Sequence, residues 1–374
     1  MKIAITGADG FLGWHTRAGL RARGDSEVVA IDRALAARPS DLAAALDGAD
    51  AVIHCAGVNR AEPPEEVVQG NILAAEQLTE SLSRAKVRPL VLYANSIHSG
   101  EQSPFGEGKE TAAGHLKAWG DRAGAPVADI RLPNLFGEHG RPGYNSFVAT
   151  FCHALATGAE PVIKDDRVVP LLHVQDAVDV MVDLVDGTAG GVFHPEGNPS
   201  SVTDVLAKLR GFAELYRSGD VPDIANRFDR ALFNTFRSFC FPARFPIHPR
   251  RHADNRGSLF ECVRARGGEA QVFCSETNPG FTRGDHFHRR KVERFVVLSG
   301  SARISLRRVL TDEIVDFEVS GDHTALVDMP TLWAHAITNT GPSELVTLFW
   351  ADEVLDPNHT DTYPEKVRAD VSSA

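Results

Sequence analysis

The feature that most constrains the fold lies at the N-terminus, where a short apolar segment runs directly into a glycine-rich turn. Residues 2–6 have the composition of a buried strand, and Gly7, Gly10 and Gly13 follow before a helical pattern begins. Glycines at this spacing give a tight turn, let the backbone approach a pyrophosphate and direct a helix N-terminus toward its charge. We therefore predict a dinucleotide-binding turn, which includes Phe11, at the edge of a parallel α/β sheet.

Strand and helix patterns alternate along the rest of the N-terminal half. Apolar runs predict strands at residues 3–5, 28–31, 51–54, 90–93 and 127–130. Helical patterns lie between them, for example at residues 14–23, 41–46 and 71–82. This order is typical of βαβ units. We predict a doubly wound parallel sheet of the Rossmann type, in a domain that covers residues 1–245.

The pattern changes near residue 250, where short β-rich runs are separated by glycine, proline and aspartate turns. These runs lie at residues 271–275, 294–298, 302–309, 313–319, 324–328 and 345–350. Such spacing predicts an antiparallel barrel or sandwich. We assign this all-β domain to residues 250–370, and we expect a closing helix and a linker in the Arg- and Phe-rich segment 228–246.

The bulk composition excludes several classes of partner. The formal net charge is −11, from 39 basic and 50 acidic residues, which argues against nucleic acid or an anionic membrane as the partner. A local basic group or helix terminus can still hold an anionic small ligand. The sequence shows no apolar run long enough to span a membrane, no signal peptide and no CxxC pair among its cysteines. We expect a cytoplasmic protein with reduced thiols.

Two neighbouring residues bear on the choice of dinucleotide. Asp32 ends the second predicted strand, where a carboxylate would accept hydrogen bonds from a ribose 2′-hydroxyl and favour NAD. Arg33 could instead pair with a 2′-phosphate and favour NADP. Asp32 could also simply cap the following helix. The choice between NADP and NAD stays open at this point.

The N-terminal half resembles the extended short-chain dehydrogenase/reductase family over roughly residues 1–180. The resemblance is carried by the glycine turn, by Asn71 and by the segments 50–57 (which includes Ala56), 131–137 and 173–176. The family uses a serine or threonine and a Tyr-x-x-x-Lys pair on one helix face. The resemblance implies that Ala56 contacts the cofactor, and that Lys109 holds its ribose and lowers the pKa of a catalytic tyrosine.

The catalytic residues match this family pattern incompletely. Ser96 fits the serine position and Lys109 the lysine position, but Phe105 stands where the tyrosine is expected. A phenylalanine ring cannot donate a proton, and losing a general acid typically costs about 10²–10⁴-fold in rate. Either His98 or a bound water replaces the acid, or this half binds a dinucleotide with little reduction. His98 could also be an ordinary exposed loop residue.

Three histidines and a glutamate in the C-terminal half have the spacing of a metal site. His286 and His288 are two residues apart on a predicted strand, so both side chains point to one face. Glu293 follows after a short turn, and His335 supplies a third imidazole. This spacing is similar to the motifs of the cupin (jelly-roll) barrel family. The donor set suits Zn²⁺, Fe²⁺, Mn²⁺ or Ni²⁺ without choosing among them.

Over nearly its whole length the chain resembles the family of bifunctional capsular-polysaccharide reductase/epimerases, in which such a reductase is fused to a zinc cupin. The matching segments are 56–60, 133–137, 144–146, 149–152, 254–258, 319–322, 356–358 and 361–363. The resemblance implies that the cupin binds Zn²⁺ and epimerises C3 of a UDP-linked 6-deoxy-4-keto (2-acetamido) sugar. It implies further that the Rossmann half reduces C4 with NADPH, and that the chain forms a homodimer or a higher homo-oligomer.

The same resemblance suggests residues around the sugar. Lys291 matches a family lysine and is our candidate for acid/base catalysis, with a solvated strand position as the alternative. Asp254 and Arg256 resemble the pocket-lining Asp-x-Arg-Gly segment of related deoxysugar epimerases. Candidates for substrate contact in the first domain are Arg131, Asn134 and Tyr144.

Three functional hypotheses follow. The first is a bifunctional epimerase and reductase acting on a UDP- or dTDP-linked 4-keto-6-deoxy sugar. The second is an epimerase whose Rossmann half is disabled or repurposed because of Phe105. The third is a non-enzymatic sensor of nucleotide sugars.

Overall fold

The computed structural model describes residues 1–255 and 257–368. The chain forms two compact units. One consists of Met1–Phe136 and Val168–Ser200, and the other of Gly137–Arg167 and the described residues from Ser201 onward. The domain boundary that we place between residues 245 and 250 stays a prediction.

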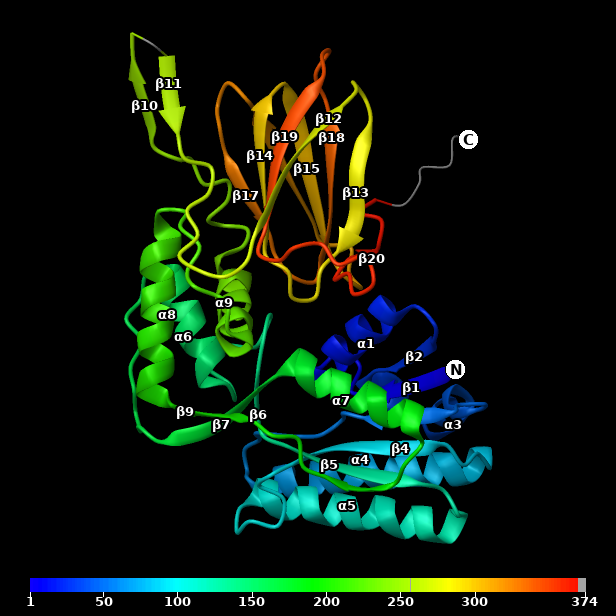
Figure 1. Cartoon of the computed structure of the whole chain (residues 1–374). Helices are drawn as coiled ribbons and strands as arrows, with labels where there is room; N and C mark the ends of the chain where they lie inside the picture. Colours follow the sequence, from blue (N-terminus) through cyan, green and yellow to red (C-terminus); the bar gives the residue numbers. More distant parts are fainter. Residues whose placement is uncertain (256, 369–374) are drawn as a thin grey trace. The chain divides into compact units, whose positions relative to one another are not determined.

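The first unit contains a six-stranded parallel sheet in the order β2-β1-β3-β4-β5-β8 (Figure 1). Its strands are β1 (Lys2–Thr6), β2 (Glu27–Ile31), β3 (Ala51–His54), β4 (Leu90–Ser96), β5 (Val127–Leu132) and β8 (Gly191–Phe193). Its helices are α1 (Phe11–Arg23), α2 (Arg33–Ala36), α3 (Pro39–Leu46), α4 (Glu65–Ala85), α5 (Pro104–Ala123) and α7 (Val174–Gly187).

Helices cover both faces of this sheet because successive strand residues point to opposite sides. Ile3 and Ile5 of β1 pack in a cluster with Met181 of α7. Ala4, between them in sequence, packs in a second cluster with Leu116 of α5. The predicted Rossmann-type arrangement is therefore confirmed. A small sheet, β6-β7-β9, lies beside it and consists of β6 (Asn134–Phe136), β7 (Val168–His173) and β9 (Asn198–Ser201).

The second unit joins three helices to two antiparallel sheets (Figure 1). The helices are α6 (Phe147–Thr157), α8 (Val202–Arg217) and α9 (Arg227–Cys240). One sheet has the order β12-β19-β14-β17, with β12 (Gln271–Thr277), β19 (Leu345–Ala351), β14 (Glu293–Ser299) and β17 (Leu326–Met329). The other has the order β16-β15-β18-β13-β20, with β16 (Ile314–Ser320), β15 (Ser301–Arg308), β18 (Trp333–Asn339), β13 (Thr282–Phe287) and β20 (Tyr363–Pro364).

One apolar core fills the space between the two antiparallel sheets. Phe295 and Phe349 reach it from the four-stranded sheet, and Ile304 and Ile337 from the five-stranded sheet. The fold class expected from the sequence, a parallel α/β sheet followed by an all-β region, is confirmed. Within the described residues, no helix combines the length and apolarity that a membrane crossing needs.

The elements match the expectations with two differences. Helices α1, α3 and α4 begin earlier than the apolar patterns suggested, because their first turns carry few buried residues. Strand β18, which carries His335, is not among the strands predicted from apolar runs. The closing helix expected in 228–246 is present as α9. A separate hairpin of β10 (Arg251–Asp254) and β11 (Gly257–Phe260) precedes the antiparallel sheets.

A buried ionic network ties α8 to the four-stranded sheet. The Arg294 guanidinium lies 2.9 Å from the Asp328 carboxylate, which also accepts a hydrogen bond of 2.8 Å from the Tyr216 hydroxyl. Burial alone would raise the pKa of Asp328, but Arg294 outweighs burial and the pKa is lowered. Removing one partner of such a pair leaves an uncompensated buried charge. The network therefore fixes β14, whose first residue is Glu293.

Candidate metal centre and dinucleotide site

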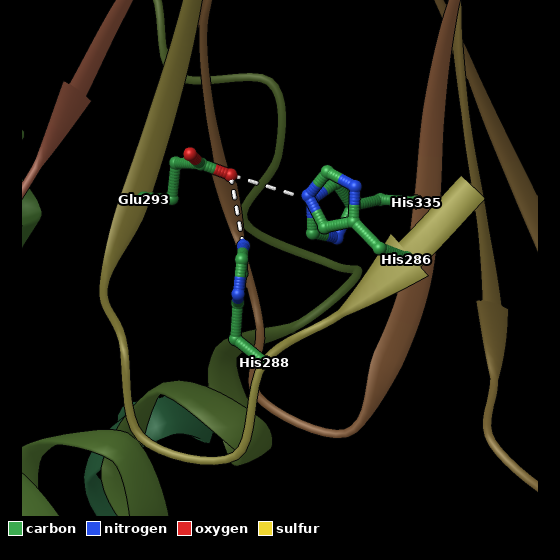
Figure 2. A group of neighbouring side chains, drawn as sticks. All are labelled: His286, His288, Glu293 and His335. Carbon is green, nitrogen blue, oxygen red and sulfur yellow. Dashed lines mark hydrogen bonds and ion pairs between the residues drawn. The ribbon is translucent and has the colours of Figure 1, made fainter. Parts of the chain in front are cut away.

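Four side chains from three strands and one loop converge inside the second unit (Figure 2). His286 lies in β13, His288 just beyond its end, Glu293 at the start of β14 and His335 in β18. One ligand atom of each lies within 4.8 Å of the others. Glu293 Oε2 is 3.1 Å from His288 Nε2 and 3.3 Å from His335 Nε2. The four predicted metal ligands are thus brought together.

The donor set and its geometry fit a transition-metal ion. Zinc bonds of about 2.0–2.2 Å to imidazole and carboxylate place the ligand atoms of a tetrahedral site about 3–4 Å apart. His288, Glu293 and His335 are nearly inaccessible to solvent, whereas His286 is partly exposed. A buried cluster of imidazoles and a carboxylate is a costly arrangement unless its members are paired or bind a cation. These residues could therefore hold Zn²⁺ or a similar ion, with His286 at the open side.

A backbone irregularity in β13 orients the His286 side chain toward the other three candidate ligands. The pairing of β13 with β18 shifts between Gly284 and His286, and His286 then lies opposite His335. Gly284 has a φ of +107°, and a Cβ there would lie 2.6 Å from the carbonyl oxygen of His335. Only glycine fits this close approach. The bulge therefore brings two of the ligands into one register pair.

Burial keeps two of the histidines, His286 and His335, neutral, as metal ligation requires. Burial lowers the pKa of His286 to about 3, with further lowering from His335 and His288. Burial also lowers the pKa of His335, although Glu293 opposes this. For Glu293 itself burial acts to raise the pKa, but hydrogen bonds with His288 and His335 hold it well below its usual range. The site thus offers these two neutral imidazoles beside an ionised carboxylate.

Helix α9 supports the loops that carry the ligands, which the sequence did not indicate. Asn234 donates a hydrogen bond of 2.7 Å to the carbonyl of Arg290, between His288 and Glu293. Arg237 donates to the carbonyl of Met329, in the strand that pairs with Glu293. Both side chains are buried. Their partners lie at least 56 residues away, so only the folded structure connects them to the site.

Lys291 is buried in the same loop, which argues against the alternative of a solvated strand position. It is 9% exposed, and its Nζ donates a hydrogen bond of 3.3 Å to Thr362 Oγ1.

Glu138 makes a buried contact with the loop before another ligand strand. Its carboxylate accepts a hydrogen bond of 2.7 Å from Thr331. Thr331 lies in the loop before β18, which carries His335.

In the first unit, the glycine turn has the tight geometry expected of it. Gly7 has a φ of +65°, and a Cβ there would lie 2.8 Å from the backbone of Ala56. A Cβ at Gly13 would lie 2.1 Å from the carbonyl oxygen of Gly7. Gly10 caps α1 without a side-chain hydrogen bond, and Phe11 is its first helical residue. The backbone amides of the first turn are thus not occupied by a side-chain cap, as a phosphate-binding helix terminus requires.

The residues expected to select the dinucleotide have local roles. The Asp32 carboxylate caps α2 by accepting a hydrogen bond of 2.7 Å from the Leu35 amide. The capping alternative is therefore present, and it leaves the second carboxylate oxygen for a ribose. Arg33 is exposed at the first position of the same helix. The choice between NAD and NADP is not decided by these contacts.

Phe105 and Lys109 lie four residues apart on α5, on one helix face, as the family pattern requires. Lys109 Nζ donates a hydrogen bond of 2.8 Å to the carbonyl of Ala94, and it lies 5.9 Å from the centre of the Phe105 ring. Burial lowers the pKa of Lys109 to about 8. Ser96 ends β4, and its hydroxyl accepts a hydrogen bond from the His98 amide.

His98 pairs with a carboxylate near the end of β4. Its ring lies 2.9 Å from the Glu101 carboxylate, and its side chain is 41% exposed. Both predictions for His98, a replacement acid and an ordinary loop histidine, stay open.

Of the substrate residues predicted for the first domain, Arg131 and Asn134 belong to the first unit, but Tyr144 belongs to the second. Arg131 is held by Glu110 at 3.1 Å and by Asp129 at 3.2 Å. Asn134 begins β6, and Tyr144 lies under the Arg141 guanidinium, 5.0 Å from ring centre to carbon. Asp254 is exposed in the β10–β11 hairpin, and Arg256 lies outside the described residues.

Comparison with known proteins agrees with both halves. The model of the NAD dependent epimerase/dehydratase family matches residues 3–193, and that of the polysaccharide biosynthesis C-terminal domain matches residues 252–363. The UDP-2-acetamido-2,6-beta-L-arabino-hexul-4-ose reductase of Pseudomonas aeruginosa is 34% identical over 369 residues, which cover 97% of this chain and 98% of the relative. The crystal structure of the capsular polysaccharide assembling protein CapF from Staphylococcus aureus is 31% identical, with a TM-score of 0.63, and the match covers 98% of this chain and 100% of CapF. The chain belongs to the CapF family.

Membership in the CapF family makes the chain a nucleotide-sugar enzyme of the NAD-dependent epimerase/reductase type in polysaccharide biosynthesis. The fold of the first half also recurs in the UDP-glucose 4-epimerase of Thermus thermophilus in complex with NAD, at 20% identity and a TM-score of 0.51. That match covers 57% of this chain and 84% of the epimerase, and it supports the fold alone.

Proposed function

We propose that the chain epimerises C3 of a UDP-linked 6-deoxy-4-keto (2-acetamido) sugar in its C-terminal half and reduces C4 with NADPH in its N-terminal half. The observation that carries this proposal is the buried cluster of His286, His288, Glu293 and His335 on the same chain as the glycine turn. A 4-keto group acidifies the neighbouring C3–H bond, so one ketone serves both reactions.

The epimerisation needs a group that moves the C3 proton between the two faces of the sugar. Zn²⁺, when bound by the cluster, would supply Lewis-acid stabilisation of negative charge on the C4 oxygen. Lys291 is buried in the loop between His288 and Glu293 and is our candidate for the proton transfer. Asp254, in β10, is a candidate for a sugar contact, and so is Arg256, which lies outside the described residues.

The reduction needs the cofactor, an orienting hydroxyl and a proton for the C4 oxygen. NADPH or NADH, bound at the glycine turn, would supply the hydride. Lys109 would hold the nicotinamide ribose, and Ser96 would orient the C4 carbonyl. Phe105 supplies no proton, so the proton comes from His98 or from a bound water. Asn134, Tyr144 and Arg131 are the candidates for contact with the sugar nucleotide.

The two reactions can be measured separately with one substrate. A UDP-linked 4-keto-6-deoxy sugar incubated with the full chain in D₂O, without cofactor, should gain deuterium at C3 in the NMR spectrum. Addition of NADPH should then cause a loss of absorbance at 340 nm. Deuterium exchange without NADPH consumption, despite normal binding of NADPH, would contradict the reductase part. Absence of both signals with UDP- and dTDP-linked 4-keto sugars would contradict the enzymatic proposal and favour a sensor of nucleotide sugars.

Phe105 favours a second candidate function, an epimerase whose N-terminal half only binds the dinucleotide. The Phe105→Tyr variant distinguishes the two. Because Phe105 shares a helix face with Lys109, a hydroxyl on its ring would complete the family pattern. A rate gain toward the 10²–10⁴-fold range of a restored acid would mean that the pocket is intact but lacks its acid. An inactive wild type that is not rescued would mean that the pocket has been repurposed.

We also propose a homodimer that forms through the antiparallel sheets, and a cytoplasmic location. Strand β12 pairs with β19 on one side only within the described residues, and Val272 on it is 58% exposed. An unpaired edge with exposed apolar residues is a site for pairing with another chain.

A further inference from the structure

The main chain of Asp361 fixes one of the candidate metal ligands. His288 Nδ1 forms a buried hydrogen bond with the carbonyl oxygen of Asp361. A carbonyl oxygen only accepts hydrogen bonds, so Nδ1 carries a proton, and Nε2 is the ring nitrogen that would offer its lone pair to a metal ion. That Nε2 is the atom that faces Glu293, 3.1 Å away. The contact with Asp361 therefore selects the tautomer that can bind a metal ion.

The side chain of Asp361 fixes the loop that joins two ligands. Its carboxylate is fully buried and accepts hydrogen bonds from three consecutive backbone amides. The distances are 3.2 Å from the Arg289 amide, 2.7 Å from the Arg290 amide and 2.8 Å from the Lys291 amide. These residues connect His288 to Glu293. One carboxylate, about 70 residues further along the chain, thus sets the path of the loop between them.

The next residue, Thr362, contacts the candidate acid/base. Its hydroxyl oxygen accepts the hydrogen bond of 3.3 Å from Lys291 Nζ. The following residue, Tyr363, begins β20, which pairs with Phe287 and His286 of β13. The segment is therefore anchored in the same sheet that carries His286.

We propose that Asp361 and Thr362 are positioning residues: Asp361 holds His288 and its loop for metal binding, and Thr362 holds Lys291 for proton transfer. The part on Lys291 rests on the proposed function, whereas the part on Asp361 rests only on the metal site. Partners of this kind outside the ligand set typically contribute about 10–100-fold to metal affinity.

Metal affinity of the full chain, measured by competition of Zn²⁺ with a chromophoric chelator, tests the role of Asp361. Asp361→Ala should weaken Zn²⁺ binding about 10–100-fold. Asp361→Asn keeps one acceptor oxygen and should weaken it less. The visible absorption of Co²⁺ bound at the site should change in both variants, because the carboxylate no longer fixes the loop between His288 and Glu293. Asp356→Asn is the matched control, since it removes the same charge from an exposed turn nearby and should leave the affinity within about twofold.

Folding is monitored separately, by melting of each variant without metal. Zn²⁺ affinity and a Co²⁺ spectrum equal to wild type in Asp361→Asn or Asp361→Ala, even with a lower melting temperature, would overturn the proposal and leave Asp361 a purely structural residue. If Asp361→Ala does not fold, Asp361→Asn carries the test.

Thr362→Val tests the second part. It should lower deuterium exchange at C3 by about tenfold or more and shift the pH profile of that exchange, while Zn²⁺ affinity stays unchanged. An unaltered exchange rate and pH profile would overturn the role of Thr362. If the wild type itself exchanges no deuterium, the proposed function fails, and the result for Asp361 still stands on metal affinity alone.

Discussion

Of the three glycines in the N-terminal turn, Gly13 has the least room for a side chain. The Gly13→Ala Cβ would lie 2.1 Å from the carbonyl oxygen of Gly7, and the obstructing atom is backbone. Relieving such a contact typically costs about 1–3 kcal/mol and would displace the turn. We expect NADPH to bind at least about tenfold more weakly, as measured by quenching of protein fluorescence.

The matched control is Gly114→Ala in α5, where a Cβ meets open space. Alanine is the better helix former, so this variant should bind NADPH normally and be as stable as wild type or more stable. If Gly13→Ala binds NADPH as well as Gly114→Ala does, the turn does not hold the pyrophosphate.

His54, at the end of β3, predicts a dependence of stability on pH. Burial lowers the pKa of its ring to about 3, with a smaller contribution from Lys109, and Thr6 contacts its Nδ1 at 2.7 Å. Below pH 6.5 the unfolded chain binds a proton at His54, whereas the buried ring of the folded chain stays neutral. Stability is therefore complete above pH 6.5 and is lost as the pH falls toward 3, by about 1.4 kcal/mol per pH unit for this group.

The variant His54→Gln removes this titration. Its loss of unfolding free energy between pH 7 and pH 5, from urea denaturation, should be smaller than that of wild type by about 2 kcal/mol. His194→Gln, at an exposed position, serves as the control. Equal losses in wild type and His54→Gln would show that His54 is not held neutral.

At the scale of elements, α9 acts as a polar support beneath the ligand-bearing loops. Arg230, Asn234 and Arg237 lie on one face of it at i, i+4 and i+7. Arg230 lies 3.1 Å from the carboxylate of Asp352, which in turn accepts a hydrogen bond from the Val292 amide. Asn234 and Arg237 contact the carbonyls of Arg290 and Met329, so the row contacts the loop before Glu293 and the strand residue that pairs with it. The position of α9 therefore affects the geometry of the metal site.

The variant Asn234→Ala tests this support. It removes the 2.7 Å donor of the Arg290 carbonyl and the acceptor, 2.9 Å away, of the buried Arg237 guanidinium. An unsatisfied buried group costs about 1–3 kcal/mol. We expect the melting temperature of the metal-free chain to fall by several degrees and Zn²⁺ affinity to fall with it. Glu214→Ala, exposed on α8, should change neither. A variant that melts as wild type does would mean that α9 and the loop are independent.

The sequence was sufficient for the parts of the site that lie close together in the chain. The glycine turn follows local rules of turn geometry. The spacing of two residues identified His286 and His288 as ligands, although only His286 lies in β13 and His288 lies just beyond its end. The roles of Asn234, Asp361 and Glu138 could not be predicted in this way. Their partners are 56, 70 and 193 residues away, so only tertiary packing shows which polar group each one satisfies.

At the scale of the whole molecule, the unpaired edge of β12 predicts association. In light-scattering measurements during size exclusion, the wild type should have twice the mass of one chain. Val272→Lys introduces a charge at the exposed edge and should shift the chain toward monomer, because charged edge residues oppose strand pairing. Val168→Lys, at an exposed strand position of the first unit, is the control. A dimer of unchanged stability in Val272→Lys would place the interface elsewhere.

The metal centre is the basis of the proposed epimerase chemistry and of the roles of Lys291 and Asp361. Metal content of the purified full chain, measured by mass spectrometry after equilibration with Zn²⁺ and removal of free ions, tests this centre most directly. We expect one Zn²⁺ per chain for the wild type and for His323→Gln, an exposed histidine outside the cluster. His335→Gln should lose most of this metal. A wild type that retains no Zn²⁺, or a His335→Gln variant that retains all of it, would contradict the proposed metal centre.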